Sequence, residues 1–296
     1  FVRDTFDFEG FFFLKGHMGL MLREWSVMTS YFPFFESRSS SFDGISSVGA
    51  AMLARHIGVD EAGRGPSIGP LVVSALNIPE RDRSILRDLG VDDSKNLTKK
   101  NRNRLYKEIL SYTESLDWTI GLVICDARRI DEWMDDGNLN SLEVLLFSEA
   151  IGDAAEPDGN LEIFLDACDV DEERFGRMVS KTLGDGWLDC KIYSEHKMDS
   201  RDEVVAAASI IAKVTRDSAM EELSQELNID LGSGYPSDPK TKEALEILCE
   251  EEVLADCIRR EWANVKRAWS RNHDRPIQTR ANERNGVFQS SLDEWE

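Results

Sequence analysis

One stretch decides the fold, Ile57-Gly58-Val59-Asp60-Glu61-Ala62-Gly63-Arg64-Gly65-Pro66. A short apolar run ends on two acids, and a glycine-rich turn follows at once. A β-strand that carries carboxylates at its C-terminal end and then breaks into a loop is where open α/β sheets place their chemistry. Glycines in such a turn let backbone amides approach a ligand closely. Adjacent acids alone are most often solvated surface, so a functional interpretation depends on partners further along the chain.

The 296-residue chain is strongly acidic, with 56 Asp and Glu against 35 Lys and Arg and a formal net charge of −21. Binding to phosphates is driven by Lys and Arg, so this balance argues against a general affinity for nucleic acid. Abundant acids with few lysines are also typical of proteins from a salty cytoplasm, where about 1 M salt screens charges within roughly 3 Å. We therefore expect a cytoplasmic protein from a halophilic source.

The cysteines are odd in number and scattered, at positions 125, 168, 190, 249 and 257. They form no CxxC pair, so the sequence predicts neither a disulfide scaffold nor a zinc site. No apolar run reaches the roughly 18 residues that a membrane span needs. We expect no membrane partner, and we take the chain to be a monomer.

Residues 1–51 differ from the rest of the chain. Their aromatic residues cluster without helical or strand period, and a serine-rich stretch follows that is typical of a linker. We interpret 1–51 as a disordered or non-native leader. The expected remainder is a catalytic domain over 52–230, a helical C-terminal cap over 231–271 and a flexible tail over 272–296.

From residue 55 onward the hydrophobic pattern is α/β. Strands are predicted at 57–60, 71–78, 118–125, 161–166 and 191–193. Helices are predicted at 81–89, 98–112, 127–133, 141–151, 170–183, 199–227, 241–250 and 251–271. Strands first and helices interleaved later predict a central mixed sheet flanked by helices.

Three segments end on acids: Asp60 with Glu61, then Asp166, then Asp199. If the sheet brings them together, four carboxylates share one site. Two unit charges about 4 Å apart repel by roughly 4 kcal/mol at an effective dielectric of 20, so such a cluster needs cations. Oxygen ligands favour Mg²⁺ or Mn²⁺, and a pair of these ions suits phosphodiester hydrolysis. The alternative is that Asp166 and Asp199 only cap the helices that follow them.

These acidic segments belong to a series of motifs that resembles a known family. The opening stretch resembles the first motif of ribonuclease HII, the type 2 ribonuclease H. Later blocks match that family in order, at residues 93–97, 166–175, 195–199, 207–213 and 232–239. The resemblance covers about residues 55–269 and is closest to the archaeal branch, which agrees with a halophilic source.

The resemblance implies a ribonuclease H-like fold and cleavage of RNA in RNA–DNA hybrids. It also implies cleavage 5′ of single ribonucleotides in duplex DNA, by two-metal-ion hydrolysis that leaves 5′-phosphate and 3′-hydroxyl ends. The metal-binding catalytic acids become Asp60, Glu61, Asp166 and Asp199. The implied substrate-binding residues are Gly63, Arg64 and Gly65 at the 2′-hydroxyl, Tyr235 on the sugar at the RNA–DNA junction, and Lys95 at a phosphate.

Three further residues near these motifs have plainer interpretations. We interpret His196 as a structural or orienting residue rather than a general acid. Asp202 is expected on the surface of a first helical turn, with a supporting role as the alternative. Lys213 either reaches a substrate phosphate or pairs with a neighbouring acid, and the sequence leaves both open.

A second motif lies in the tail. Gln289, Leu292 and Trp295 fit the spacing of the peptide that docks on the replication sliding clamp, and one helical turn puts Leu292 and Trp295 on the same face. The usual second aromatic is replaced by Glu296. The 17 residues of 272–288 would give roughly 20–25 Å of r.m.s. reach if flexible.

Two other functions compete with this interpretation. One is a different nuclease of the same metal-dependent superfamily, such as a junction resolvase. The other is a non-catalytic acidic scaffold that binds divalent ions or a clamp. The intact glycine-rich motif and Tyr235 favour the ribonuclease.

Overall fold

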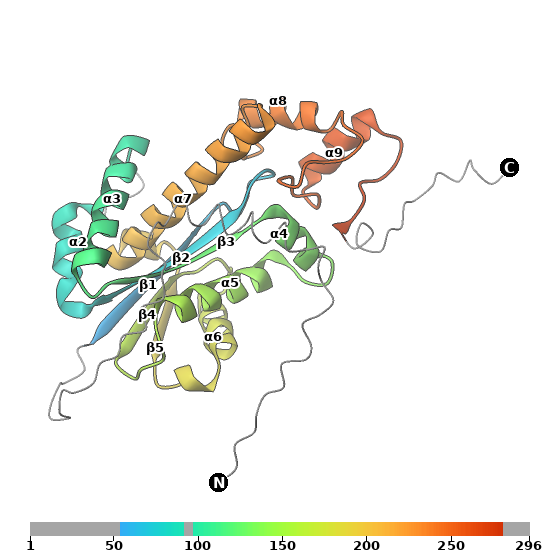
Figure 1. The fold of residues 1–296 in the computed structure, drawn as a ribbon. Coiled ribbons are helices and arrows are strands. Elements are labelled where there is room, and N and C mark those ends of the chain that lie inside the picture. Colours follow the sequence, from blue (N-terminus) through green and yellow to red (C-terminus); the bar gives the residue numbers. More distant parts are fainter. Residues whose placement is uncertain (1–53, 92–96, 281–296) are drawn as a thin grey trace, which may run out of the picture. The chain divides into compact units, whose positions relative to one another are not determined.

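A computed structural model describes residues 54–91 and 97–280 (Figure 1). These residues belong to one compact unit, Ala51–Glu296. The predicted leader, Lys95 and the clamp-like peptide lie outside the described residues. Within the described ranges, no helix combines the length and the apolar character needed to cross a membrane.

The core of the fold is a five-stranded mixed sheet with the order β3-β2-β1-β4-β5. Strand β1 pairs antiparallel with β2 and parallel with β4, while β3 joins β2 antiparallel and β5 joins β4 parallel. The bounds are β1 Arg55–Ala62, β2 Leu71–Pro79, β3 Thr119–Cys125, β4 Leu161–Asp166 and β5 Lys191–Glu195. The mixed sheet predicted from the sequence is confirmed, and the strand that carries Asp60 is its centre.

Helices cover both faces of this sheet (Figure 1). One face packs against α2 Arg83–Leu89, α3 Lys99–Ser115 and α7 Glu203–Leu227. The other packs mainly against α5 Leu139–Ala154 and α6 Glu172–Leu183, with α4 Ala127–Met134 next to them. Strand β2 is buried along its whole length, as expected of a strand covered on both sides.

Two glycines let the helices lie directly on the sheet. A Cβ on Gly58 of β1 would meet the backbone of α7, with the Val204 carbonyl oxygen only 2.7 Å away. A Cβ on Gly121 of β3 would lie 2.9 Å from the backbone nitrogen of Ala154 in α5. Real Cβ atoms do not tolerate such distances, so glycine at these positions sets how closely α7 and α5 approach.

The C-terminal part contains α8 Pro239–Leu248 and α9 Ala263–Asn272, packed around a core of their own. The helix predicted over 251–271 begins only at Ala263, so the prediction was wrong for 251–262. The backbone of that segment pairs with the loop after β1 instead. The Arg259 amide donates to Ser67 O at 2.9 Å, and Cys257 O accepts from the Gly69 amide at 2.8 Å. A helix would have used these groups internally.

Substitution of Gly58 tests the contact between β1 and α7. We expect Gly58→Ala to lower the free energy of unfolding by about 1–3 kcal/mol, because the added methyl group forces two backbones apart. The control is Gly152→Ala, at an exposed position in α5 with nothing within 4 Å of the added Cβ. It should raise the free energy of unfolding by about 0.5–1 kcal/mol. Urea denaturation measures both, and an unchanged midpoint for Gly58→Ala would contradict the packing.

Candidate active site

Parallel pairing of β1 with β4 brings two of the predicted acids together. The last pair in the register is Val59 with Leu165, so the next residue of each strand, Asp60 and Asp166, lies beside the other. Asp199 lies in the short 3-10 helix η4 Met198–Ser200, directly before α7. One carboxylate oxygen from each of these three acids falls within 4.8 Å of the others. The structure therefore joins acids that are up to 139 residues apart in the sequence.

The turn that carries Asp199 is fixed by Asp166. Asp166 Oδ1 accepts hydrogen bonds from the backbone amides of Lys197, at 2.8 Å, and Met198, at 3.4 Å. Lys197 has a φ of 58°, in the left-handed region that reverses the chain between β5 and η4. One carboxylate thus serves the cluster and also holds the loop that delivers the third acid.

Burial and mutual repulsion change the acidity of the cluster. Burial raises the pKa of Asp60 well above its ordinary value, and the neighbouring Glu61 charge raises it further. Burial, followed by the charges of Asp60 and Asp199, raises the pKa of Asp166 to about 6. Carboxylates crowded in this way favour protonation or a cation between them. An all-oxygen donor set with this excess of negative charge fits a hard divalent ion such as Mg²⁺ or Mn²⁺.

Lys213 and Ser209 of α7 oppose this effect at Asp60. Lys213 Nζ donates to Ser209 Oγ at 2.6 Å. The Ser209 hydroxyl hydrogen-bonds to Asp60, and both this bond and the Lys213 charge lower the pKa of Asp60. Lys213 thus lies near the acid cluster through Ser209, and both roles that the sequence leaves open for it stay predictions.

Glu61 lies beside the three-oxygen group rather than within it. Its carboxyl group hydrogen-bonds to Asp60 and to the thiol of Cys168. Burial raises the pKa of Glu61, and the charges of Glu143 and Asp166 add to that effect. Burial and neighbouring acids therefore raise the pKa of Glu61 in the same direction as that of Asp60.

The loop after β1 packs against the predicted junction residue. Gly63 has a φ of 95°, and a Cβ there would lie 2.6 Å from Pro70 O and 2.5 Å from Cδ of the buried Arg216. A Cβ on Gly65 would be 3.6 Å from the ring of Tyr235, which is 40% exposed. The structure therefore packs Gly65 against the partly exposed ring of Tyr235, and Arg216, which packs against Gly63, also lies over that ring.

Two side chains of α5 hold Arg64 in place. Its Nε donates to Glu143 Oε1 at 2.7 Å and its Nη2 to Asn140 Oδ1 at 2.6 Å, while its side chain stays 41% exposed. Glu143 is fully buried, and burial raises its pKa to about 7 although the Arg64 charge opposes the shift. The sequence did not predict Glu143 or Asn140 as supports of Arg64, because a single polar residue in a helix forms no recognisable pattern.

Arg259 is a second support that the sequence did not reveal. This buried side chain donates to three backbone carbonyls of the loop, Gly63 O at 2.6 Å, Arg64 O at 3.0 Å and Gly69 O at 3.0 Å. Burial lowers its pKa to about 9. The Trp262 indole adds a bond to Gly65 O at 3.2 Å. The C-terminal segment 249–262 thus fixes the path of the loop.

Two neighbouring residues have structural roles. His196 hydrogen-bonds through Nε2 to Asp169 O at 2.6 Å and lies 2.8 Å from Glu172 through Nδ1, which agrees with an orienting role. The prediction that Asp202 lies on the surface was wrong. Asp202 caps α7 by accepting from Val204 and Val205, and it is buried against His56 and Arg83. The start of α7 packs on β1, so its cap is covered.

Comparisons with known proteins agree with this geometry. A family model described as Ribonuclease HII matches residues 57–265. The ribonuclease HII of Methanococcus maripaludis strain C7 is 42% identical over 211 residues, covering 71% of this chain and 85% of that protein. The ribonuclease H2 structure from Pyrococcus horikoshii OT3 superposes with a TM-score of 0.66 at 37% identity, covering 75% of this chain and all of that one. A structure of the PCNA:RNase HII complex from Archaeoglobus fulgidus gives a TM-score of 0.61 at 30% identity, covering 81% and 99%.

Asp166→Asn tests the repulsion within the acid cluster. The variant keeps the oxygen that accepts from Lys197 and Met198 but removes the charge. Since the pKa of Asp166 is raised from 3.8 to about 6, the folded state binds more protons than the unfolded state between these values. The stability of the parent protein therefore falls as pH rises through that window. We expect Asp166→Asn to be more stable than the parent in EDTA at pH 7.5, with the gain vanishing toward pH 4.

Urea midpoints at pH 4.5 and 7.5 measure this difference. The exposed Asp136→Asn is the control and should show no gain that depends on pH. Addition of Mg²⁺ at pH 7.5 should stabilise the parent more than Asp166→Asn. A variant less stable than the parent in EDTA at pH 7.5 would show that the carboxylates do not repel one another.

Proposed function

Since the chain belongs to the ribonuclease HII family and is therefore an endoribonuclease of RNA–DNA hybrids, we propose that it also cuts on the 5′ side of single ribonucleotides embedded in duplex DNA. The products would be 5′-phosphate and 3′-hydroxyl ends, and the biological roles ribonucleotide excision and primer removal. One observation carries the proposal. Asp60 of the acid cluster stands three residues before Gly63 in the chain, and Gly65 of the same loop packs against the ring of Tyr235.

The acids are assigned to metal binding. We propose that Asp60, Glu61, Asp166 and Asp199 hold two ions, Mg²⁺ or Mn²⁺. When bound, such ions supply Lewis acidity to the scissile phosphate and to the attacking water. The protein's part is to hold its carboxylates in place. The amides of Lys197 and Met198 orient Asp166, and the Ser209 hydroxyl, backed by Lys213, orients Asp60.

Recognition of the ribonucleotide is assigned to the loop after β1. The 2′-hydroxyl is the group that distinguishes RNA from DNA. Gly63 and Gly65 carry no side chain that would keep this hydroxyl away from their backbone. Arg64 is already bound to α5 through Nε and Nη2, so its exposed guanidinium is held ready for a phosphate. Tyr235 would stack on the sugar at the junction. Lys95, outside the described residues, remains a proposed phosphate contact.

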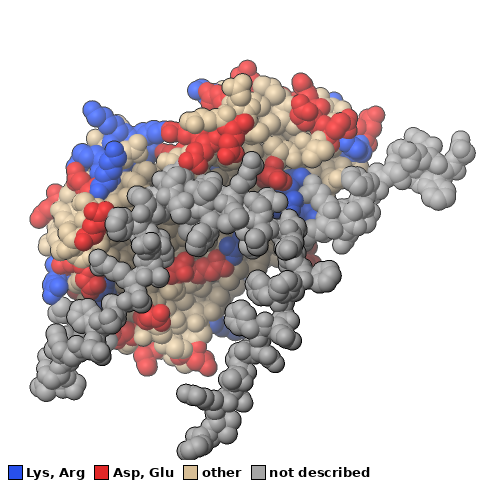
Figure 2. Space-filling view, in the orientation of Figure 1, with Lys and Arg blue, Asp and Glu red and all other residues tan. Residues whose placement is uncertain are grey.

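The distribution of charge supports a salty cytoplasm as the working environment. Acidic side chains are spread over much of the visible face, and Lys and Arg gather at the upper left, over α3 (Figure 2). Exposed cations of α3 include Lys99, Lys100, Arg104 and Lys107. About 1 M salt reduces the range of repulsion to roughly 3 Å, so a duplex can approach this acidic protein closely. We therefore propose a halophilic archaeal source and an activity that rises with KCl.

Cleavage of duplex DNA that contains one ribonucleotide tests the function. With Mg²⁺ or Mn²⁺ we expect a cut on the 5′ side of the ribonucleotide, faster at high than at low KCl. Asp166→Asn should lose about 10²-fold or more in rate, since several kcal/mol of transition-state stabilisation depend on the metal ligands.

Tyr235→Ala should weaken binding about tenfold while Tyr235→Phe keeps it, because aromatic stacking contributes about 1–3 kcal/mol.

The outcome separates the alternatives. A folded protein that binds Mg²⁺ but cuts at no salt concentration would be the acidic scaffold. Cleavage of four-way junctions that contain no ribonucleotide would identify a resolvase.

We also propose that the chain binds the replication sliding clamp through Gln289, Leu292 and Trp295. Two observations favour this second function. The spacing of the three residues fits the docking peptide, and a ribonuclease HII at 30% identity is described in complex with PCNA.

Leu292→Ala combined with Trp295→Ala tests clamp binding. The double variant removes both apolar side chains of the peptide, so surface plasmon resonance should show at least a tenfold loss of affinity for the clamp. Cleavage without the clamp should not change. Ser290→Ala, at a position that the peptide pattern does not specify, is the control. Undiminished binding of the double variant would refute the assignment.

A further inference from the structure

Three successive carbonyl groups of the loop after β1 bind the C-terminal segment. Arg259 donates from Nη2 to Gly63 O at 2.6 Å and from Nη1 to Arg64 O at 3.0 Å. The Trp262 indole donates to Gly65 O at 3.2 Å. Since the Arg259 side chain is fully buried, the Gly63 and Arg64 carbonyls point toward the interior of the protein.

The direction of these carbonyls fixes the direction of the amides between them. A trans peptide is planar, so its C=O and N–H groups point in opposite directions. The Gly63 carbonyl shares its peptide with the Arg64 amide, and the Arg64 carbonyl shares its peptide with the Gly65 amide. Both amides therefore point away from Arg259, on the side where Gly65 is exposed and Arg64 partly so. The third peptide adds no donor, because Pro66 has no N–H.

The two amides are available to a ligand. Neither of them donates a hydrogen bond to any residue that the structure describes. Successive unpaired N–H groups in a turn can bind one oxygen atom together. A nucleic-acid substrate offers two kinds of oxygen, the phosphate oxygens and the ribose 2′-hydroxyl, and only the 2′-hydroxyl is missing from DNA.

The sequence of the loop does not fix this orientation by itself. Glycines stand on both sides of Arg64, and Gly63 has a φ of 95°. Glycine adopts positive and negative φ about equally readily, so both peptides could turn over and present an acceptor in place of a donor. The guanidinium of Arg259 donates in a fixed plane, so its two η nitrogens hold both carbonyls at once. A third bond, from Nε to Gly69 O at 3.0 Å, fixes the guanidinium itself.

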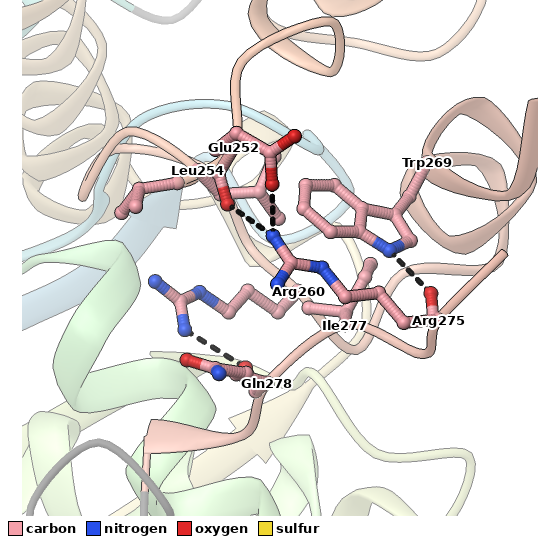
Figure 3. A pocket seen from close by; sticks show the side chains of 8 residues that line it. Glu252, Leu254, Arg260, Trp269, Arg275, Ile277 and Gln278 are labelled. Carbon is pink, nitrogen blue, oxygen red and sulfur yellow. Dashed lines mark hydrogen bonds and ion pairs between the residues drawn. The ribbon is translucent and has the colours of Figure 1, made fainter. Parts of the chain in front are cut away.

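The segment that carries Arg259 is held in turn by the residues that follow α9. Arg260 Nη1 donates to Gln278 O at 2.8 Å (Figure 3). Arg275 bonds to both the backbone and the carboxylate of Glu252 (Figure 3). The sequence predicted that the residues after α9 belong to a flexible tail, whereas the structure attaches them to the C-terminal segment. Arg259 therefore binds the loop from a fixed position.

We propose that Arg259 is a positioning residue for ribonucleotide recognition, because its guanidinium keeps the amides of Arg64 and Gly65 turned toward the 2′-hydroxyl oxygen of the substrate. This inference rests on the proposed assignment of the loop to the 2′-hydroxyl. It adds the side chain that makes the loop a donor to that oxygen. Loss of Arg259 would then affect the distinction between RNA and DNA more than the binding of a duplex as such.

Arg259→Lys and Arg259→Met test this role. Lysine keeps the positive charge but has one nitrogen in place of the planar fork, so it cannot hold both carbonyls in the same geometry. Methionine removes every donor and keeps a flexible apolar side chain in the buried space. Arg55→Lys is the matched control, since Arg55 begins β1 at the end opposite to the loop and donates to the Asp117 carbonyl at 2.7 Å. Arg259→Lys carries the test if Arg259→Met folds poorly.

The measurement is the dissociation constant for a duplex with one ribonucleotide and for the same duplex made of DNA alone. Every protein carries Asp166→Asn, so that cleavage is slow during the binding experiment. We expect the preference for the ribonucleotide duplex to fall about tenfold in Arg259→Met and by less in Arg259→Lys, because two hydrogen bonds to the 2′-hydroxyl lose their fixed donors. Affinity for the DNA duplex should stay unchanged, and Arg55→Lys should keep the full preference.

The two duplexes separate the possible outcomes. Equal loss of affinity for both would mean that the amides bind a phosphate or that Arg259 only supports the fold, and it would overturn the proposal. An undiminished preference in Arg259→Met would overturn it as well. If the protein with Asp166→Asn alone binds both duplexes equally, the assignment of the loop to the 2′-hydroxyl fails first, and this inference fails with it.

Discussion

Repulsion between buried carboxylates is the constraint on which the site depends. Parallel pairing of β1 with β4 forces Asp60 and Asp166 together, and η4 adds Asp199 within the same 4.8 Å. Burial magnifies the repulsion, because the effective dielectric falls as water is removed. Burial and this repulsion together raise the pKa values of Asp60 and Asp166. The site is therefore built for a bound ion at a cost to the stability of the metal-free fold.

The rest of the structure holds these charges in place despite that cost. Gly58 lets α7 lie directly on β1, and this contact brings Ser209 and Lys213 to Asp60. The cap of α7 is itself secured by Asp202 against His56 and Arg83. A small displacement of α7 would therefore change both the position of Asp199 and the charge around Asp60. Close packing of α7 on the sheet is thus part of the chemistry as well as of the fold.

The elements that could be predicted from the sequence are those with local signals. The apolar run before Asp60 and Glu61 and the strand ending at Asp166 predict the mixed sheet and place acids at neighbouring strand ends. The supports could not be predicted. Arg259 acts on backbone carbonyls, which every residue possesses, and Glu143 looks like any acid of a helix. Asp202 looked exposed because its covering residues, His56 and Arg83, are more than 100 positions away. Lys95 and the clamp peptide lie outside the described residues and stay predictions.

The buried arginines explain how so acidic a chain keeps the loop after β1 in shape. Arg216, Arg259 and Arg280 are each almost fully buried, and all three donate to backbone carbonyls. A guanidinium offers five donors in a fixed plane, so one side chain can join segments that share no secondary structure. Arg216 and Arg259 join the loop after β1 to the segments before α8 and before α9. Salt screens buried charges much less than exposed ion pairs. The buried guanidinium groups therefore hold the loop after β1 by bonds that depend little on ionic strength, whatever the charge of the surface.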